Sequence, residues 1–178
     1  MFRYNIDEEH STYVPAVAVN FHRAFLSANE VFTQFRAEFI GKCSQVHLFW
    51  GGFDFAVSRF SGREAPLHPG GIPNMPDRVA IEAYSHEVSS CGFWPGNEAV
   101  PFAFYSCIYP EPAGFNTPDI KPEAAFYHKN LREYILYYKD VQQFENPALT
   151  LMNFLHSTST GAGELAKWDR GKLEKSYS

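Results

Sequence analysis

The stretch QVHLFWGGFDFAVSRF, residues 45–60, decides the fold, because two apolar runs of strand-forming residues meet there at Gly51-Gly52. A two-residue glycine connection is typical of a tight β-hairpin, since its turn needs positive φ angles that glycine adopts without strain. The turn fixes which residues of the two strands lie opposite each other. The predicted register makes one face of the hairpin apolar by pairing Trp50 with Phe53, Leu48 with Phe55 and Val46 with Val57.

The other face of this predicted hairpin carries polar side chains. There His47 lies opposite Ala56, and Phe49 lies opposite Asp54. His47 and Asp54 are therefore diagonal neighbours within side-chain reach. A histidine with a carboxylate behind it is an arrangement found in acid–base and metal sites. The alternative is a solvated outer face, which antiparallel sheets commonly have.

The composition narrows the class of protein. At 178 residues the chain suffices for one domain, and its 17 Phe, 10 Tyr and 3 Trp indicate either a tightly packed core or a wide apolar cavity. A net charge of −5 without a basic cluster excludes nucleic acid as a partner. Three cysteines without CxxC spacing favour a reducing compartment. With no signal peptide and no membrane-spanning stretch, we expect a cytoplasmic protein without a membrane partner.

A long helix precedes the hairpin. Residues 1–13 read as a polar N-terminal segment, and a helix is predicted from Pro15 to Ile40, with Gly41 as its stop. We expect its apolar stripe to pack across the sheet rather than against a partner helix. The stripe consists of Val14, Ala18, Phe21, Phe25, Ala28, Phe32, Phe35 and Phe39.

The remainder of the chain completes an α+β fold. We predict a single domain over residues 14–169, with an antiparallel sheet of five to six strands covered by the N-terminal helix and a C-terminal helix. The expected elements are a loop at 61–76, a short helix capped by Asp77, strands at 86–96 and 99–110, a hairpin or helix at 123–138, a helix from Asn146-Pro147 to Trp168, and a mobile tail at 170–178.

A metal site is one hypothesis for the chemistry. If residues 77–86 were helical, Glu82 and His86 would share one face at a spacing that offers two ligands. His47 would be the third ligand, with Asp54 or Glu87 completing the set. No metal is favoured, because two ligands at helical spacing occur often by chance.

An acid–base site is the favoured hypothesis. Its catalytic candidates are His47, Asp54, His86 and Glu87, since a histidine beside a carboxylate can move a proton near neutral pH. Its ligand-binding candidates are Trp50, Arg59, Tyr84 and Trp94. Each has a structural alternative: the aromatic rings can belong to the core, and Arg59 can form a salt bridge with Glu82 or Glu87 at the sheet edge.

Three runs of sequence carry a resemblance to a known family: HLFWGGFDFAVSRFSGR at 47–63, EAYSHEVSSCGFWPG at 82–96 and YPEPAGF at 109–115. They resemble a mainly bacterial family catalogued as domain of unknown function 5996. The chain resembles the C-terminal part of longer members, which carry a further N-terminal segment. The resemblance implies no activity. It raises the expectation that a second chain, in a homodimer or as a partner with the missing N-terminal half, supplies a wall of the pocket.

The function expected from the sequence is binding of a small molecule in an aromatic-lined pocket with a His/Asp/Glu acid–base cluster. The loop from Ser61 to Pro76 would gate this pocket. One alternative is a non-catalytic structural or self-association domain, and another is a metal-dependent enzyme that uses Glu82 and His86. The sequence leaves open whether the protein is an enzyme, and it identifies no cofactor.

Overall fold

The structure, a computed structural model, describes residues 13–50, 52–72, 75–97 and 100–175. Within these ranges six strands form one antiparallel sheet in the order β1-β2-β3-β4-β6-β5, which confirms the predicted α+β fold. The strands are β1 (His47–Phe49), β2 (Asp54–Glu64), β3 (His86–Trp94), β4 (Ala103–Tyr109), β5 (Phe126–His128) and β6 (Glu133–Tyr137). The helices are α1 (Pro15–Ala37), α2 (Asp77–Ala83), α3 (Tyr138–Val141), α4 (Pro147–Leu165) and α5 (Arg170–Leu173).

The β1–β2 hairpin has the predicted register, with His47 opposite Ala56, Leu48 opposite Phe55 and Phe49 opposite Asp54. Gly51, one of the two residues of the predicted turn, lies outside the described residues. Because the register is the predicted one, alternate residues of β2 point to opposite faces as expected.

Strand β2 continues to Glu64, so the prediction that a loop begins at Ser61 was wrong. Gly62 has a φ of +86°, and the pairing with β3 shifts register between Phe60 and Glu64. This is the behaviour of a β-bulge, which bends a strand without ending it.

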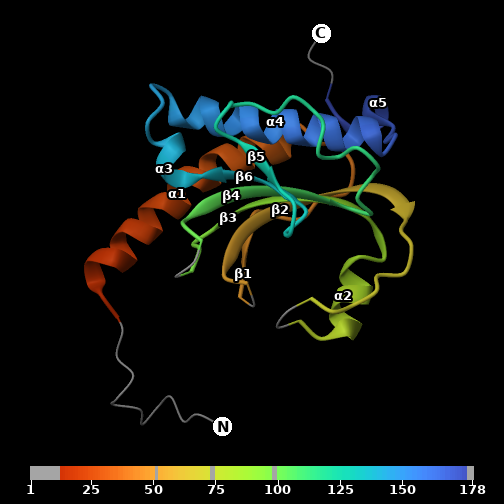
Figure 1. The fold of residues 1–178 in the computed structure, drawn as a ribbon, viewed down its shortest axis with the longest axis horizontal. Helices are drawn as coiled ribbons and strands as arrows, with labels where there is room; N and C mark the ends of the chain where they lie inside the picture. The colour runs from red at the N-terminus through yellow and green to blue at the C-terminus, as the bar shows by residue number, and fades with distance from the viewer. Residues whose placement is uncertain (1–12, 51, 73–74, 98–99, 176–178) are drawn as a thin grey trace.

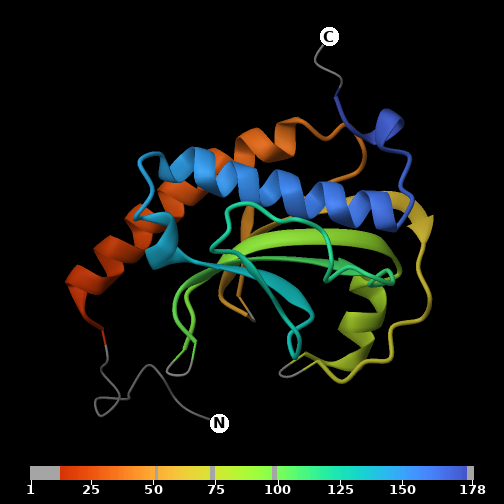
Figure 2. The same ribbon diagram turned by 45° about the horizontal axis from the view of Figure 1, so that its top comes forward.

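Helices α1 and α4 lie side by side on one face of the sheet, and α2 lies on the opposite side (Figures 1 and 2). The rings of Phe32, Phe93 and Phe154 are fully buried between the two helices and the sheet. Both predicted helices therefore cover the apolar face. Phe93 of β3 lies at the centre, 5.1–6.4 Å between ring centroids from Phe21, Phe25, Phe102, Phe104 and Tyr138.

Arg59 lies on this core face, as its strand position predicted, but it forms a salt bridge with neither Glu82 nor Glu87. Its guanidinium donates hydrogen bonds to the Phe35 carbonyl oxygen and, over 3.2 Å, to the Ser159 hydroxyl. It also stacks on the Phe35 ring, 3.3 Å from the centroid. Burial lowers the pKa of Arg59. The side chain thus places a cation at the C-terminal end of α1, where helix carbonyls lack partners.

Both ends of the domain depart from the predicted boundaries. Helix α1 ends at Ala37, because Phe39 leaves the helix to form a β-bridge with Glu174. The segment predicted to be a mobile tail contains α5, and the N–H of Ile40 donates to the Leu173 carbonyl (2.8 Å). These bonds attach residues 170–175 to the end of α1.

Three local predictions have clear outcomes. Helix α4 begins after Asn146 as predicted and ends at Leu165; the Asn146 side chain caps it by accepting a hydrogen bond from the N–H of Leu149 (3.0 Å). Residues 126–137 form the β5–β6 hairpin rather than a helix. The prediction that Asp77 caps α2 was wrong: Pro76 is the cap, and the Asp77 carboxylate accepts a hydrogen bond from the N–H of Gly71 (2.9 Å).

The central position of Phe93 gives a first prediction. Phe93→Ala should lower the free energy of unfolding by about 3–5 kcal/mol, because it removes a buried ring and leaves a cavity. The same truncation at the exposed Phe144 should cost less than about 1 kcal/mol. Urea unfolding followed by circular dichroism measures both variants, and equal losses would contradict this account of the core.

Candidate functional site

The face of the sheet turned away from α1 and α4 carries a row of polar side chains, and we call it the second face. Ser58 lies opposite Ser90, and their hydroxyl oxygens are 2.7 Å apart. The row continues because Ser90 pairs with Cys107 and Glu133 pairs with His128. Strand order and register therefore align Ser58, Ser90, Cys107, Glu133 and His128 across five strands.

An aromatic side chain on β4 flanks this row. The Tyr105 ring lies over Gly92, where a Cβ atom would come within 2.7 Å of the ring. Crossing β3 at this glycine, the Tyr105 hydroxyl donates a hydrogen bond of 2.5 Å to the Asp54 carboxylate on β2. Gly92 thus permits a contact between strands that are not neighbours.

Three rings flank the row on its other side. Tyr109 at the end of β4 meets Tyr84, which follows α2, and His68 of the connecting segment. Their centroids are 4.7–5.2 Å apart. The segment from β2 to α2 is thereby held against the second face, and the Tyr109 hydroxyl also donates to the Pro66 carbonyl oxygen (3.0 Å).

The acidic groups of the second face are strongly affected by burial. Burial, followed by the charge of Asp54, raises the pKa of Glu133 to about 7. Burial also raises the pKa of Tyr84 to about 12, with further contributions from Cys107, Glu133 and Asp54. Burial and Asp54 raise the pKa of Tyr105 well above its ordinary value. At neutral pH, Tyr105 is therefore a hydrogen-bond donor, and Glu133 exchanges its proton readily.

The carboxylates of the second face form no ion pair that joins described side chains, and the lysine nearest by strand pairing, Lys42, lies over the Phe60 ring at 5.3 Å. No lysine or arginine stands at the strand positions of this face that the structure describes. In the described parts of the chain, no group of three or more His, Cys, Asp and Glu side chains is placed to hold a metal ion. Asp54 and Glu133 are thus suited to meet a positive charge or a hydrogen-bond donor from outside the chain.

The structure brings five of the residues predicted from sequence to the second face. His47, Asp54 and His86 stand on it by strand parity, with His86 exposed at the start of β3. Trp94 lies at its β3 end, and Tyr84 covers it from the end of α2. The hydrogen-bond partner of Asp54 is Tyr105, whereas His47 Nδ1 bonds to the Gln45 carbonyl oxygen (2.9 Å).

The other predicted site residues lie elsewhere. Glu87 lies on the helix-covered side, where it pairs with Arg63 (2.7 Å), and Arg59 is buried beneath the helices. Trp50 stands at the exposed hairpin tip. Helix α2 ends at Ala83, so Glu82 and His86 lack the helical spacing on which the metal hypothesis depended.

Sequence reasoning missed Tyr105, Cys107 and Glu133. The alternation of Tyr105, Cys107 and Tyr109 was visible as a strand pattern, but nothing local says which of its sides faces the helices. Glu133 was assigned no role, because only the pairing of β6 with β4 brings it beside Cys107. Gly92 inside a strand was the available signal of a close approach.

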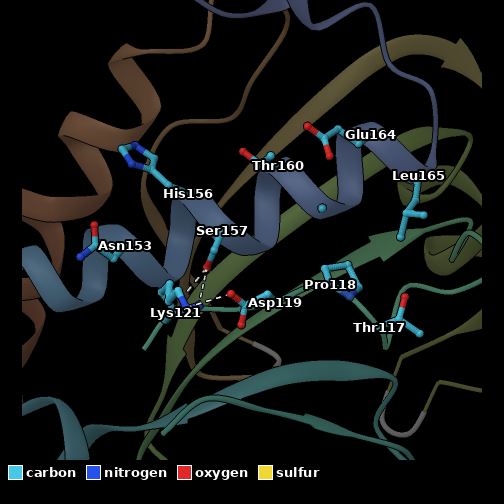
Figure 3. A pocket seen from close by; sticks show the side chains of 11 residues that line it. Thr117, Pro118, Asp119, Lys121, Asn153, His156, Ser157, Thr160, Glu164 and Leu165 are labelled. Carbon is cyan, nitrogen blue, oxygen red and sulfur yellow. Dashed lines mark hydrogen bonds and ion pairs between the residues drawn. The ribbon is translucent and has the colours of Figure 1, made fainter. Parts of the chain in front are cut away.

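A cavity of about 780 Å³ lies away from this face, between the outer side of α4 and residues 117–121 (Figure 3). Its charged side chains already have partners: Lys121 pairs with Asp119 (2.8 Å), His156 with Glu38 (2.7 Å) and Glu164 with Arg170 (3.1 Å). A charged ligand would have to compete with these pairs for the same side chains. We therefore place the candidate site on the second face.

These features define an α+β domain whose antiparallel sheet is packed with helices on one face and presents polar and aromatic side chains on the other. Within that class, the chain belongs to the family of unknown function DUF5996, whose sequence model matches residues 1–175. The match confirms the predicted family. The comparisons with curated proteins and with solved structures found no match. No helix in the described ranges has the length and apolarity to cross a membrane.

The raised pKa of Glu133 predicts a pH-dependent stability. Between its ordinary value of 4.5 and about 7, the folded chain binds more protons than the unfolded chain, so Glu133 makes stability fall as pH rises through this range. Glu133→Gln cannot ionise. At pH 8 the variant should be more stable than the wild type by up to roughly 3 kcal/mol, and at pH 5 the two should be similar.

Urea unfolding at the two pH values measures this difference. Glu82→Gln, on the exposed side of α2, is the matched control and should show no such pH-dependent gain. A Glu133→Gln variant that loses stability at pH 8 would contradict the burial of an ionisable carboxyl at this position.

The close approach at Gly92 gives another prediction. Gly92→Ala should cost about 1–3 kcal/mol, because the new methyl group would displace the Tyr105 ring and strain its bond to Asp54. Gly171→Ala is the control, since a Cβ there would meet no atom closer than 3.9 Å. Thermal unfolding of both variants tests the contact, and a neutral Gly92→Ala would refute it.

Proposed function

We propose that this domain binds a small molecule with a positively charged group against the second face of its sheet. The observation that carries the proposal is the pair of carboxylates, Asp54 and Glu133, on a face whose described strand positions hold no lysine or arginine. A positive ligand would supply the charge that the fold does not.

The two carboxylates would act differently. Asp54 is held in place by Tyr105, which occupies one of about four acceptor positions of a carboxylate and leaves others for a ligand. Glu133 has no such anchor among the described side chains, and its pKa of about 7 makes it the group that would exchange a proton with the ligand. His47, at the β1 end of the face, is the proposed further acid–base group.

The aromatic flanks favour a cation with an apolar body. The negative faces of tyrosine rings attract a cation that has lost part of its water, and the effect adds to that of nearby carboxylates. Tyr84 and Tyr105 come from opposite flanks, and the charge of Glu133 raises the pKa of both. A ligand beside Glu133 would therefore lie within the influence of both rings.

We place the protein in the cytoplasm as part of this proposal. Cys43, Cys91 and Cys107 are all free thiols, which favours a reducing compartment. Burial raises the pKa of Cys91 to about 12, so this thiol stays protonated and has no part in the proposed chemistry.

Binding is tested with benzyltrimethylammonium, whose charge does not change with pH. The cation should raise the melting temperature of the wild-type domain, whereas benzyl alcohol and benzoate should not. Its affinity should increase between pH 6 and pH 8, because a cation favours the ionised form of Glu133.

Two variants locate the site. Glu133→Gln and Asp54→Asn should each weaken the binding of benzyltrimethylammonium by at least about tenfold, consistent with the loss of one charged contact. Glu82→Gln, outside the second face, should bind like the wild type. Preference for benzoate, or unchanged binding by Glu133→Gln, would refute the proposal.

A further inference from the structure

The first two turns of α1 have the composition of a buried helix. Residues 13–21 read YVPAVAVNF and contain no charged side chain. Since Val14, Val17 and Val19 lie on different sides of a helix, this segment is apolar nearly all round, a pattern typical of helices enclosed by protein. Its sequence therefore predicts a cover on more than one side.

The described part of the chain, from residue 13 onward, does not enclose these turns. Val14, Val17 and Val19 are 52%, 57% and 50% exposed, and the first fully buried residue of α1 is Ala24. The N-terminal part of α1 extends beyond the edge of the sheet and beyond α4 (Figures 1 and 2). The first two turns of α1 therefore lie outside the core.

Exposed rings extend this apolar surface. Phe21 contacts Phe53 of the hairpin tip and Phe102 before β4, at centroid distances of 5.6 and 6.1 Å. Phe53 and Phe102 are 43% and 42% exposed, and the neighbouring Trp50 is 82% exposed. We call this patch the α1 surface; its exposed residues are Val14, Val17, Trp50, Phe53 and Phe102, whereas Val19 lies on the other side of the helix.

The size of the α1 surface matches an interface. Taking about 150–250 Å² for an aromatic side chain and roughly 150 Å² for a valine, its five residues expose roughly 500 Å². That is in the upper half of the range for the largest apolar patch on an ordinary monomer, about 300–600 Å². It also approaches the roughly 800 Å² that each partner contributes to a stable complex, once surrounding atoms are included.

We infer that a second copy of this chain covers the α1 surface, with the first two turns of α1 in each copy packed against the same turns and the hairpin tip of the other. Two arguments select a second copy. Homodimer interfaces are more apolar than those between proteins that also exist apart, and this segment of α1 carries no charge. A twofold axis also pairs one patch with itself, so a single apolar patch is sufficient.

The composition of the α1 surface argues against the main alternative partner, a lipid membrane. Helices that lie on membranes combine an apolar face with a polar face rich in lysine and arginine, which attracts anionic headgroups. Residues 13–21 contain neither lysine nor arginine, and the valines do not keep to one face.

Sedimentation velocity of the full chain at 1–100 µM tests the inference. The wild type should sediment as a dimer, with twice the 20.3 kDa mass of the chain. Val17→Glu should sediment as a monomer, with a dissociation constant at least about 100-fold higher, because it would bury two unpaired charges at the twofold contact. Val79→Glu, at an exposed valine on α2, should remain dimeric.

A second measurement follows the wild-type chain by its own tryptophan fluorescence. Diluting the wild-type chain should increase acrylamide quenching of tryptophan fluorescence, because dissociation exposes Trp50. Trp50→Phe should abolish this increase. A wild-type monomer at 100 µM would overturn the inference, as would a Val17→Glu variant that dimerises like the wild type. A monomer that sediments with phosphatidylcholine vesicles would assign the α1 surface to a membrane and overturn it equally.

Discussion

The strict alternation of side chains along the antiparallel strands is the constraint on which the rest of this structure depends. Phe93 points into the helix-covered core, so its neighbours Gly92 and Trp94 must stand on the second face. Because every pairing in the sheet is antiparallel and in fixed register, this assignment extends from β1 to β5. A slip of one residue would bring Asp54 into the core and expose Phe55.

The core face holds the buried Arg59, whose two terminal nitrogens have hydrogen-bond partners although its Nε has none among the described residues. Arg59 follows the same parity as Phe55 and Val57, and it reaches the C-terminal carbonyls of α1 rather than a carboxylate. Stacking on Phe35 offsets part of the cost of removing its charge from water. The residue therefore joins β2, α1 and α4 instead of contacting a ligand.

The second face holds an ionisable group, Glu133, whose burial lowers the stability of the fold at neutral pH and suits it to acid–base chemistry. A raised pKa means that the folded chain disfavours the ionised form of Glu133, so the fold bears a free-energy cost at neutral pH. Groups retained under such a cost are commonly functional. The contact between Tyr105 and Asp54 depends in turn on the missing side chain at Gly92, which links the backbone of β3 to the orientation of a carboxylate on β2.

The sequence by itself determined the hairpin register, the apolar stripe of α1 from Phe21 to Phe35, the start of α4 and the α+β class, whereas Val14 of the predicted stripe is exposed. These follow from contacts between residues close in the chain and from periodicity. It also placed His47 and Asp54 on one surface. Only the tertiary structure brought Glu133 beside Cys107, separated Glu87 and Arg59 from the candidate site, and showed that the first turns of α1 extend past the sheet. Those outcomes depend on the order in which distant strands pair and on where the sheet ends relative to the helix. No local pattern encodes either one.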